Sequence, residues 1–574
     1  MRSQFCISLL GAALLLACTS HAFAQDPAVL SNPSISKPVA FAVTPPLRDL
    51  ISEQPQEIPF GFHEGPPARY PKEALMRHAK AAGKQAFHDP LAAGYDSADS
   101  APTQLLNWLG MGQGFFGYGV YIDPSDMNVS IGDNEIVQWG NNNFTVFDLN
   151  GNDLIKGVQH YLPGNVLFTG LPRCGPANDG DPVAQWDKMA HRWVMIQAAE
   201  APPSRDCIAV SQTPDALGAW YAYEFATPVS ATDLLDYTKL GVWPDAFYVS
   251  HNDFLYQGAF QGTLPCAYER AKMLAGDPSA QQVCFMDRTG NSKIGQVDWP
   301  QSFDDNQLPG DIDSPNSLPP AGTPDLYFGS IDNTSDGYVN NLYYYKFHVD
   351  WNNPQNSTFT CVNGTCPLPV AQFYVGSWLG PAPEPGGYQV GALADRLMYR
   401  LAYRVLPSPV INSTVRGGPQ QSWLISHAVN SDWALGIRWY ELRAPLGGTD
   451  PYVYQQGTFA PNYWIWRFMS SMAMDKTGNI AMSYAISNSS WLYPSIAFTG
   501  RAANDPPGTM GTEQIALQGT GSQTLGNGRW GDYYNMSLSN DGCTFVTTGE
   551  YYTANASFGW STRVLKLKFD NCIP

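Results

Sequence analysis

Charged side chains recur near the start of several strand-rich segments of this chain. Only 14 % of its 574 residues are charged, so repeated charges at similar places stand out. Paired carboxylates can supply the acid and the base for glycosidic cleavage, and arginine offers fixed pairs of donors to a carboxylate or sulfate. The candidates for catalysis are Asp181, Asp245, Asp532 and Arg529, and the candidates for substrate binding are Asp236, Lys239, Arg396, Arg400, Trp530 and Tyr533.

Arg529 and Asp532 are the strongest of these candidates. Trp530 and Tyr533 stand beside them in the sequence, and aromatic faces of this kind stack on sugar rings. The same residue types also have a structural interpretation, because Asp and Arg join neighbouring sheets as buried ion pairs. Both interpretations stay open for each single residue, while the set as a whole predicts one polar mouth that contacts a ligand.

Metal and cofactor motifs are weak. The oxygen spacing of Asp126, Asn128 and Ser130 is that of a calcium loop, but Ile131 and Val137 stand where such a loop needs Gly and Glu. The chain contains neither a G-x-S-x-G nor an H-E-x-x-H motif. The sequence therefore identifies no cofactor and leaves the metal content unknown. Binding of a calcium ion stays open.

Short β-rich runs from about residue 101 to 574 are the elements that would position these side chains. Val, Ile, Phe, Tyr and Trp dominate the runs, and Gly, Asn and Asp mark the turns between them. The runs form about seven clusters of roughly 68 residues each, a length that suits four-stranded blades. We predict an all-β, seven-bladed β-propeller, with six or eight blades left open because the spacing of the clusters is irregular.

The first 100 residues differ from the rest. Arg2, an apolar run over 5–17 and an A-x-A site ending at Ala24 predict a signal peptide over 1–24. A competing interpretation is a bacterial lipobox, in which Cys18 carries a lipid anchor. Residues 25–100 are rich in proline and predict an extended arm with one helix, over 71–87.

Eight cysteines remain after the signal segment, and an even number in an exported chain predicts disulfides. Their placement favours pairs between neighbours in the sequence, with some free thiols as the alternative. The predicted pairs are Cys174 with Cys207, Cys266 with Cys284, Cys361 with Cys366, and Cys543 with Cys572.

Several stretches from 101 to 574 resemble exported bacterial β-propeller proteins, which are mostly uncharacterised and distantly similar to sialidase-type propellers. The matching stretches are 180–183, 193–195, 209–215, 220–221, 236–239, 241–245, 395–400, 438–443, 471–475 and 529–533. The resemblance implies the propeller fold and export, and no settled reaction. Sialidase activity is not expected, because only 539–545 approaches the Asp-box of those enzymes and the early Arg-Ile-Pro motif is absent.

These patterns predict an exported enzyme, secreted or periplasmic, that acts on an extracellular polysaccharide or related polar polymer as a hydrolase or a lyase. The alternatives are a non-catalytic propeller that binds a glycan or protein, and an outer-membrane lipoprotein as its location. A net charge of −18 argues against nucleic acid as the partner. We expect no membrane span and a monomer.

Overall fold

The computed structural model describes residues 28–51, 89–93, 100–157, 159–256, 258, 260–286, 307–314, 318–331, 338–362, 365–375, 381–394, 396–407, 418–524 and 528–574. Helix is scarce in these ranges, which confirms the all-β prediction. The helical segments are α2 (Arg270–Leu274) and the short 3-10 turns η1 (Leu47–Asp49), η2 (Gly164–Phe168) and η3 (Pro354–Asn356). The helix predicted over 71–87 lies outside the described residues.

The strands form an 11-stranded sheet, two 5-stranded, three 4-stranded sheets and a small 2-stranded one. Within them, consecutive strands make seven antiparallel groups of four. The first three groups are β6 (Asn128–Ile131), β7 (Glu135–Gly140), β8 (Asn143–Asp148) and β9 (Leu162–Pro163); β10 (Val183–Asp187), β11 (Arg192–Ala199), β12 (Arg205–Ser211) and β13 (Trp220–Ala226); and β14 (Asp233–Val242), β15 (Phe247–Leu255), β16 (Phe260–Tyr268) and β17 (Gln282–Cys284).

The next three groups run from residue 308 to residue 519. They are β18 (Leu308–Ile312), β19 (Asp325–Ile331), β20 (Tyr338–His348) and β21 (Thr358–Val362); β25 (Leu401–Leu406), β26 (Gln420–Ser431), β27 (Ala434–Pro445) and β28 (Tyr452–Phe459); and β29 (Trp466–Met474), β30 (Ile480–Ser487), β31 (Tyr493–Arg501) and β32 (Gln514–Gly519). The fourth and fifth groups share the 11-stranded sheet, because β18 pairs in parallel with β25.

The last group closes the ring of sheets. It holds β33 (Met536–Leu538), β34 (Thr544–Tyr552), β35 (Trp560–Lys568) and β5 (Thr103–Gly112), so the strand that enters the body pairs with the strand that ends it. Besides the strands of the arm, three described strands lie outside the groups: β22 (Pro367–Tyr374), which pairs with β20 and β26, and the pair β23 (Ala382–Pro383) and β24 (Gln389–Val390).

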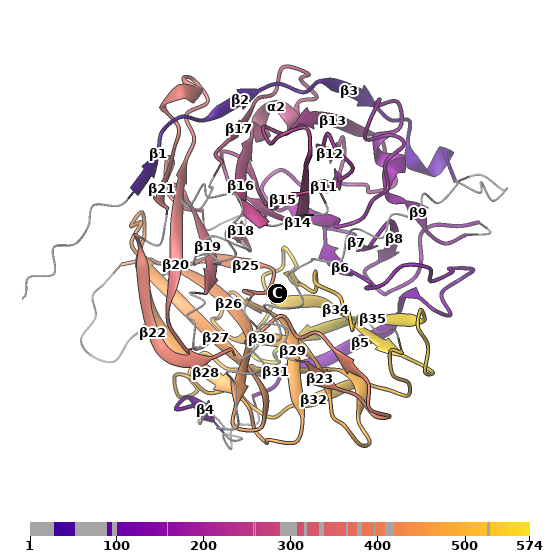
Figure 1. The fold of residues 1–574 in the computed structure, drawn as a ribbon, viewed down its shortest axis with the longest axis vertical. Coiled ribbons are helices and arrows are strands. Elements are labelled where there is room, and N and C mark those ends of the chain that lie inside the picture. The colour runs from indigo at the N-terminus through magenta and orange to yellow at the C-terminus, as the bar shows by residue number, and fades with distance from the viewer. Residues whose placement is uncertain are drawn as a thin grey trace, which may run out of the picture.

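The sheets are arranged radially around a centre, as in a β-propeller (Figure 1). The first strands of the groups face this centre and run in one direction. Contacts between β6 and β10 show this direction for one pair, since Ala184 N donates to Asn128 Oδ1 (2.9 Å) and Trp186 N donates to Ser130 Oγ (3.1 Å). Gly241 lets β14 approach β18 closely, since a Cβ there would lie 2.4 Å from the carbonyl oxygen of Gly310.

Segments of the arm add strands to the outer edges of three sheets, and the 11-stranded sheet gains one at each end. β1 (Ala28–Leu30), β2 (Ser34–Ser36) and β3 (Ala40–Val43) pair with β21, β17 and β13, and β4 (Ala92–Ala93) pairs with β28. Figure 1 shows β1 to β3 following the outside of the ring in indigo. An edge strand offers unpaired N–H and C=O groups to any extended segment, which the sequence pattern alone did not reveal. The domain boundaries at 24 and 100 stay a prediction.

Four disulfides are present, and all four predicted pairs are confirmed. Their Cα–Cα distances are 5.6 Å for Cys174–Cys207, 4.1 Å for Cys266–Cys284, 5.0 Å for Cys361–Cys366 and 5.5 Å for Cys543–Cys572. Disulfides fit an oxidising compartment such as the periplasm or the extracellular space. No helix among the described residues is both long enough and apolar enough to cross a bilayer.

Candidate active site

The N-terminal ends of the first strands meet at one end of the central axis, which we call the mouth. Asp126 precedes β6, Asp181 precedes β10, Asp236 lies at the bulge of β14, and Asp532 precedes β33. Asp126 and Asp181 have left-handed backbones, with φ values of 43° and 51°. Left-handed Asp residues occur in tight turns and at functional sites, which makes the mouth the first place to look for chemistry.

Three carboxyl groups gather at the mouth. One oxygen each of Asp181, Glu200 and Asp236 lies within 4.8 Å of the others. Glu200 occupies the turn between β11 and β12, which ends at the mouth because β11 runs antiparallel to β10. Solvent partly reaches Asp181 and Asp236, whereas Glu200 is buried. Glu200 was not among the predicted site residues, and its one signal in the sequence is a charge beside a predicted turn.

Asp181 and Asp236 have opposite pKa shifts. Burial alone would raise the pKa of Asp181, but hydrogen bonds from Asp236 and Tyr533 and the charge of Lys239 bring it below its usual value. The backbone N–H of Tyr237 also donates to Oδ2 of Asp181, at 2.8 Å. Burial, and then the negative charge of Asp181, raise the pKa of Asp236 well above its usual range. The pair therefore holds one proton near neutral pH.

Glu200 also keeps its proton. Burial and the charges of Asp181 and Asp236 raise its pKa well above the usual value. Asp126 behaves in the same way, through burial and the charge of Asp532. The raised pKa values of Glu200 and Asp126 favour their neutral forms, which limits the repulsion among the carboxyl groups at the mouth.

Lys239, Arg396 and Arg529 are the basic residues beside these carboxyl groups. The side chain of Lys239 is fully buried, and its Nζ lies 3.3 Å and 3.4 Å from the ring centroids of Tyr533 and Tyr237. Burial lowers its pKa to about 7, against the opposing charge of Asp181. The Arg529 guanidinium contacts Asp532 Oδ2 at 2.5 Å.

Most of the residues predicted to line a polar mouth are found there. They are Asp181, Asp236, Lys239, Arg396, Arg529, Asp532 and Tyr533. Arg396 joins them by its guanidinium, which lies 4.8 Å from the ring centroid of Tyr237. The structure brings these residues together, and their individual roles stay predictions.

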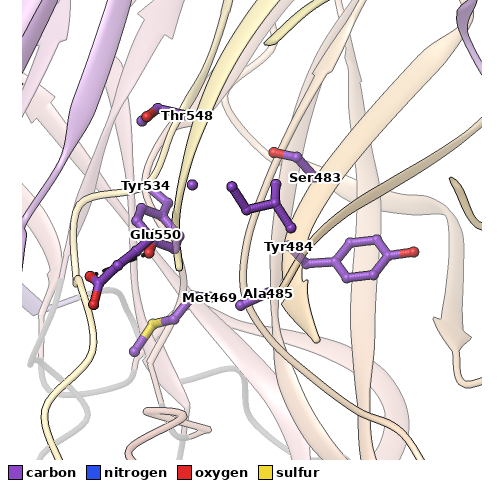
Figure 2. A pocket seen from close by; sticks show the side chains of 9 residues that line it. Met469, Ser483, Tyr484, Ala485, Tyr534, Thr548 and Glu550 are labelled. Atoms are coloured by element: carbon purple, nitrogen blue, oxygen red, sulfur yellow. Dashed lines mark hydrogen bonds between the residues drawn. The ribbon is translucent and has the colours of Figure 1, made fainter. Parts of the chain in front are cut away.

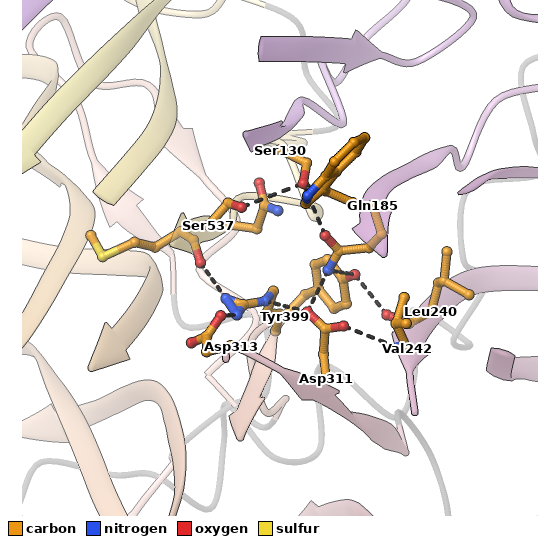
Figure 3. A network of polar contacts seen from close by, with 12 residues as sticks. Ser130, Gln185, Leu240, Val242, Asp311, Asp313, Tyr399 and Ser537 are labelled. Atoms are coloured by element: carbon orange, nitrogen blue, oxygen red, sulfur yellow. Dashed lines mark hydrogen bonds and ion pairs between the residues drawn. The ribbon is translucent and has the colours of Figure 1, made fainter. Parts of the chain in front are cut away.

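Arg400 is not at the mouth. It lies deeper in the channel, where its Nε donates to Asp311 Oδ2 (2.7 Å), its Nη1 donates to the Met536 carbonyl oxygen (2.7 Å), and its Nη2 pairs with Asp313. Asp311 also accepts from Gln185 Nε2, at 2.8 Å. Figure 3 shows this network joining first strands of different sheets. Arg400 is 1 % exposed, so we assign it to the framework and not to substrate binding.

Asp245 and Trp530 also lie elsewhere. Asp245 sits in the turn after β14, at the opposite end of that strand from the mouth, where the Tyr248 hydroxyl donates to its Oδ1 at 3.3 Å. The sequence pattern placed Asp245 before the first strand of a unit. In the structure Asp245 follows β14, which is itself the first strand of its group. The indole of Trp530 is 1 % exposed and packs against Phe468 and Tyr552, so it forms core and not a sugar platform.

Asn128 and Ser130, which have the spacing of a calcium loop in the sequence, bind other groups of the protein. Asn128 Nδ2 donates to the carbonyl oxygens of Trp139 (3.2 Å) and Pro182 (2.8 Å), and Ser130 Oγ donates to Gln185 Oε1 at 3.2 Å. These side chains join neighbouring sheets. Asp181, Glu200 and Asp236 supply the oxygen ligands that a hard divalent cation prefers, although the Lys239 amine already lies close to this group.

A small cavity lies beside the mouth, between β29–β31 and the loop and strand around Tyr534 and Glu550 (Figure 2). Its lining is Met469, Ser483, Tyr484, Ala485, Ile496, Tyr534, Thr548, Gly549 and Glu550. Glu550 Oε2 accepts a hydrogen bond from Ser125 Oγ at 2.5 Å, which ties the cavity wall to the residue before Asp126.

Because buried acids hold protons in the folded chain, we predict that the free energy of unfolding falls as pH rises. Burial raises the pKa of Asp123 to about 7 and that of Glu384 to about 8, so the folded chain holds protons that the unfolded chain releases above about pH 4. The stability that these two groups contribute is fully present below about pH 4 and is lost as pH rises through 7–8. Burial lowers the pKa of Lys239 to about 7, so this residue raises the stability as pH rises above 7. It is one group against the two acids. We expect the Tm to drop by several degrees from pH 5 to pH 8.5, and a rise over this range would contradict the assignment of the protons.

No family model matches this chain, and no curated protein matches it. Solved structures show only remote similarity. A protein of unknown function from Dyadobacter fermentans DSM 18053 has a TM-score of 0.33 at 10 % identity, with 82 % of this chain and 100 % of that chain covered. The alpha-L-arabinanase of Penicillium chrysogenum, solved with arabinobiose, has a TM-score of 0.29 at 10 % identity and covers 59 % of this chain and 94 % of its own.

An endo-arabinase from Bacteroides thetaiotaomicron VPI-5482 has a TM-score of 0.25 at 12 % identity, with 58 % of this chain and 93 % of that chain covered. None of the three similarities is strong enough to support a statement about activity. They also give no support to the sialidase-type resemblance.

The turn nearest to an Asp-box is structural, since Asp541 Oδ1 accepts from the backbone N of Cys543 (2.7 Å) and of Thr544 (2.9 Å).

Proposed function

We propose that this chain is an exported glycoside hydrolase that cleaves a polysaccharide at the mouth. One observation carries the proposal. Asp181 and Asp236 are adjoining carboxyl groups, solvent reaches both, and their pKa values are shifted in opposite directions. Hydrolysis of a glycosidic bond needs one protonated and one ionised carboxyl group close together, at about 5 Å in enzymes where one of them contacts the anomeric carbon.

In the proposed reaction, Asp236 donates its proton to the glycosidic oxygen as the bond from that oxygen to the anomeric carbon breaks. The Asp181 carboxylate stabilises the positive charge that develops on the sugar ring. A water molecule then adds to the anomeric carbon, and its released proton restores the acid form of Asp236. Glu200 stays neutral behind the pair, so the only full negative charge of the three belongs to Asp181.

The other mouth residues would hold the substrate. Arg529 is the most accessible basic residue of the mouth, with 29 % of its side chain exposed, and its ion pair with Asp532 fixes its direction. Its donors can bind sugar hydroxyl groups in a fixed orientation. Arg396, Lys239 and Tyr533 shape the floor beneath the sugar through their ring and charge contacts.

The scaffold that we infer is a seven-bladed propeller, and the seven four-stranded groups support this count. Export through a signal peptide over 1–24, or a lipid anchor at Cys18, fits the four disulfides. We further infer a monomer with an arm over 25–100. A lyase and a non-catalytic glycan-binding propeller are the alternative functions.

The test is a cleavage screen on arabinan, xylan, β-glucan, galactomannan and polygalacturonate. We expect new reducing ends from at least one polymer, without the ultraviolet absorbance of unsaturated sugars. Such absorbance would mark a lyase instead. Binding without any cleavage would favour the non-catalytic propeller and overturn the hydrolase. Heat-denatured protein controls for spontaneous cleavage.

A further inference from the structure

We propose that Trp433, Trp464 and Trp491 form a rim of stacking platforms for a neutral polysaccharide beside the mouth. The inference rests on the proposed function only for the class of the ligand, since the platforms bind sugar whether or not the mouth cleaves it. These three indoles are 69 %, 53 % and 54 % exposed. Nine other tryptophans of the chain are less than 2 % exposed, so most of the described tryptophans are buried.

The three indoles lie at the same end of the molecule as the mouth. Trp433 stands at the tip of the β26–β27 hairpin, which continues past Leu424, the partner of Ala402 at the start of β25. Trp464 lies just before β29. Trp491 lies in the β30–β31 turn, and the pairing of Trp466 with Ser487 brings that turn to the same end.

Each indole is presented by a tight turn with fixed geometry. Asn488 Oδ1 accepts from the backbone N of Ser490 (3.0 Å), Trp491 (2.9 Å) and Leu492 (2.9 Å), which locks the turn that carries Trp491. Asn462 Oδ1 accepts from Ile465 N at 3.1 Å across the turn that carries Trp464.

The third turn is the shortest. Ser431 pairs with Ala434 across Asp432 and Trp433, and Asp432 takes the left-handed backbone that a two-residue hairpin needs, with a φ of 54°. Platforms held this firmly lose little conformational freedom when a ligand binds. Three largely exposed indoles on turns at one end of the molecule are the observation that points to a ligand.

A sugar ring suits these platforms because one of its faces is a layer of C–H groups that covers an aromatic ring. Tyr463 lies against Trp464 with ring centroids 4.7 Å apart and is itself 57 % exposed, which widens that platform. The three turns belong to the fifth and sixth groups of strands. One sugar ring covers one platform, and an extended chain is needed to cover all three.

Charge favours a neutral polymer over an anionic one. The turn residues around the three indoles, 431–434, 461–465 and 488–492, contain no Lys or Arg to pair with a sugar carboxylate. Their polar side chains are mainly Asn and Ser, which exchange hydrogen bonds with sugar hydroxyl groups. The whole chain carries −18, which repels polyanions.

The test measures binding of the same soluble polymers by affinity electrophoresis, with the full chain and a Trp433→Ala, Trp464→Ala, Trp491→Ala triple variant. We expect the triple variant to lose at least tenfold in affinity for a neutral polymer, and polygalacturonate to bind neither protein. Cleavage of a disaccharide or trisaccharide should not change, because so short a ligand reaches only the mouth.

Tyr452→Ala is the matched control, since Tyr452 is 46 % exposed but begins β28 at the opposite end from the mouth. Equal affinity of the triple variant and the unaltered chain would overturn the proposal. An unaltered chain that binds none of the neutral polymers would also overturn it. Loss of binding in the triple variant with no cleavage by the unaltered chain would keep the rim and reject the hydrolase, so the two failures are distinguishable.

Discussion

Replacing Asp181 with asparagine is expected to lower polysaccharide cleavage by about 10²–10³-fold, the usual contribution of one preorganised group that stabilises charge in the transition state. Asparagine keeps an acceptor for the Tyr237 N–H, which donates to Asp181 Oδ2 at 2.8 Å, so the turn should keep its shape. The amide carries no negative charge and cannot stabilise the cationic sugar. The rate of reducing-end release from the cleaved polymer measures the effect.

Asp236→Asn separates the two roles. It removes the proton donor and leaves Asp181 ionised, so the basic limb of the pH–rate profile, which reports the acid, should disappear. Asp277→Asn is the control, because Asp277 is a partly exposed carboxylate in the loop after α2 and its Oδ1 accepts from Ser279 N. An Asp181→Asn variant that cleaves at the full rate would remove Asp181 from the reaction.

Replacing Arg400 with alanine is expected to cost about 3–5 kcal/mol of unfolding free energy. The side chains of Arg400, Asp311 and Asp313 are 0 %, 3 % and 1 % exposed, so the substitution leaves two carboxylates buried without their main cation. It also removes the donor to the Met536 carbonyl oxygen, which links β33 to the network of Figure 3. Urea unfolding at pH 7 measures the loss.

Arg192→Ala serves as the matched control for Arg400. The Arg192 side chain is partly exposed and donates only to the carbonyl oxygens of Ala190 and His191 in its own turn. Its removal should change stability by less than about 0.5 kcal/mol. Unchanged stability of Arg400→Ala together with weaker glycan binding would return Arg400 to the mouth as a ligand contact.

Local features of the chain could be predicted from the sequence. The strand-rich texture predicted an all-β body, because apolar, β-branched and aromatic runs separated by turn residues determine strands through short-range preferences. The disulfides were predictable for a similar reason. Cys543 and Cys572, for example, lie 29 residues apart within one group of strands.

The edge strands of the arm could not be predicted in this way. β1 to β3 are three or four residues long and gain their pairing from sheets formed more than a hundred residues later. A segment this short has no periodic pattern of its own. Its structure depends on which sheet edge lies within reach.

The site itself was determined by the tertiary structure. Arg396 and Arg400 are four residues apart and look equivalent in the sequence, yet one lies at the mouth and the other is sealed inside the channel. Glu200 joins Asp181 only because β11 returns to the end where β10 begins. The sequence by itself determined the residue types, the strands and the local disulfides. Depth along the axis, and with it the protonation of each carboxyl group, depends on neighbours from distant sheets, because burial and nearby charge set a pKa and neither is a local property of the chain.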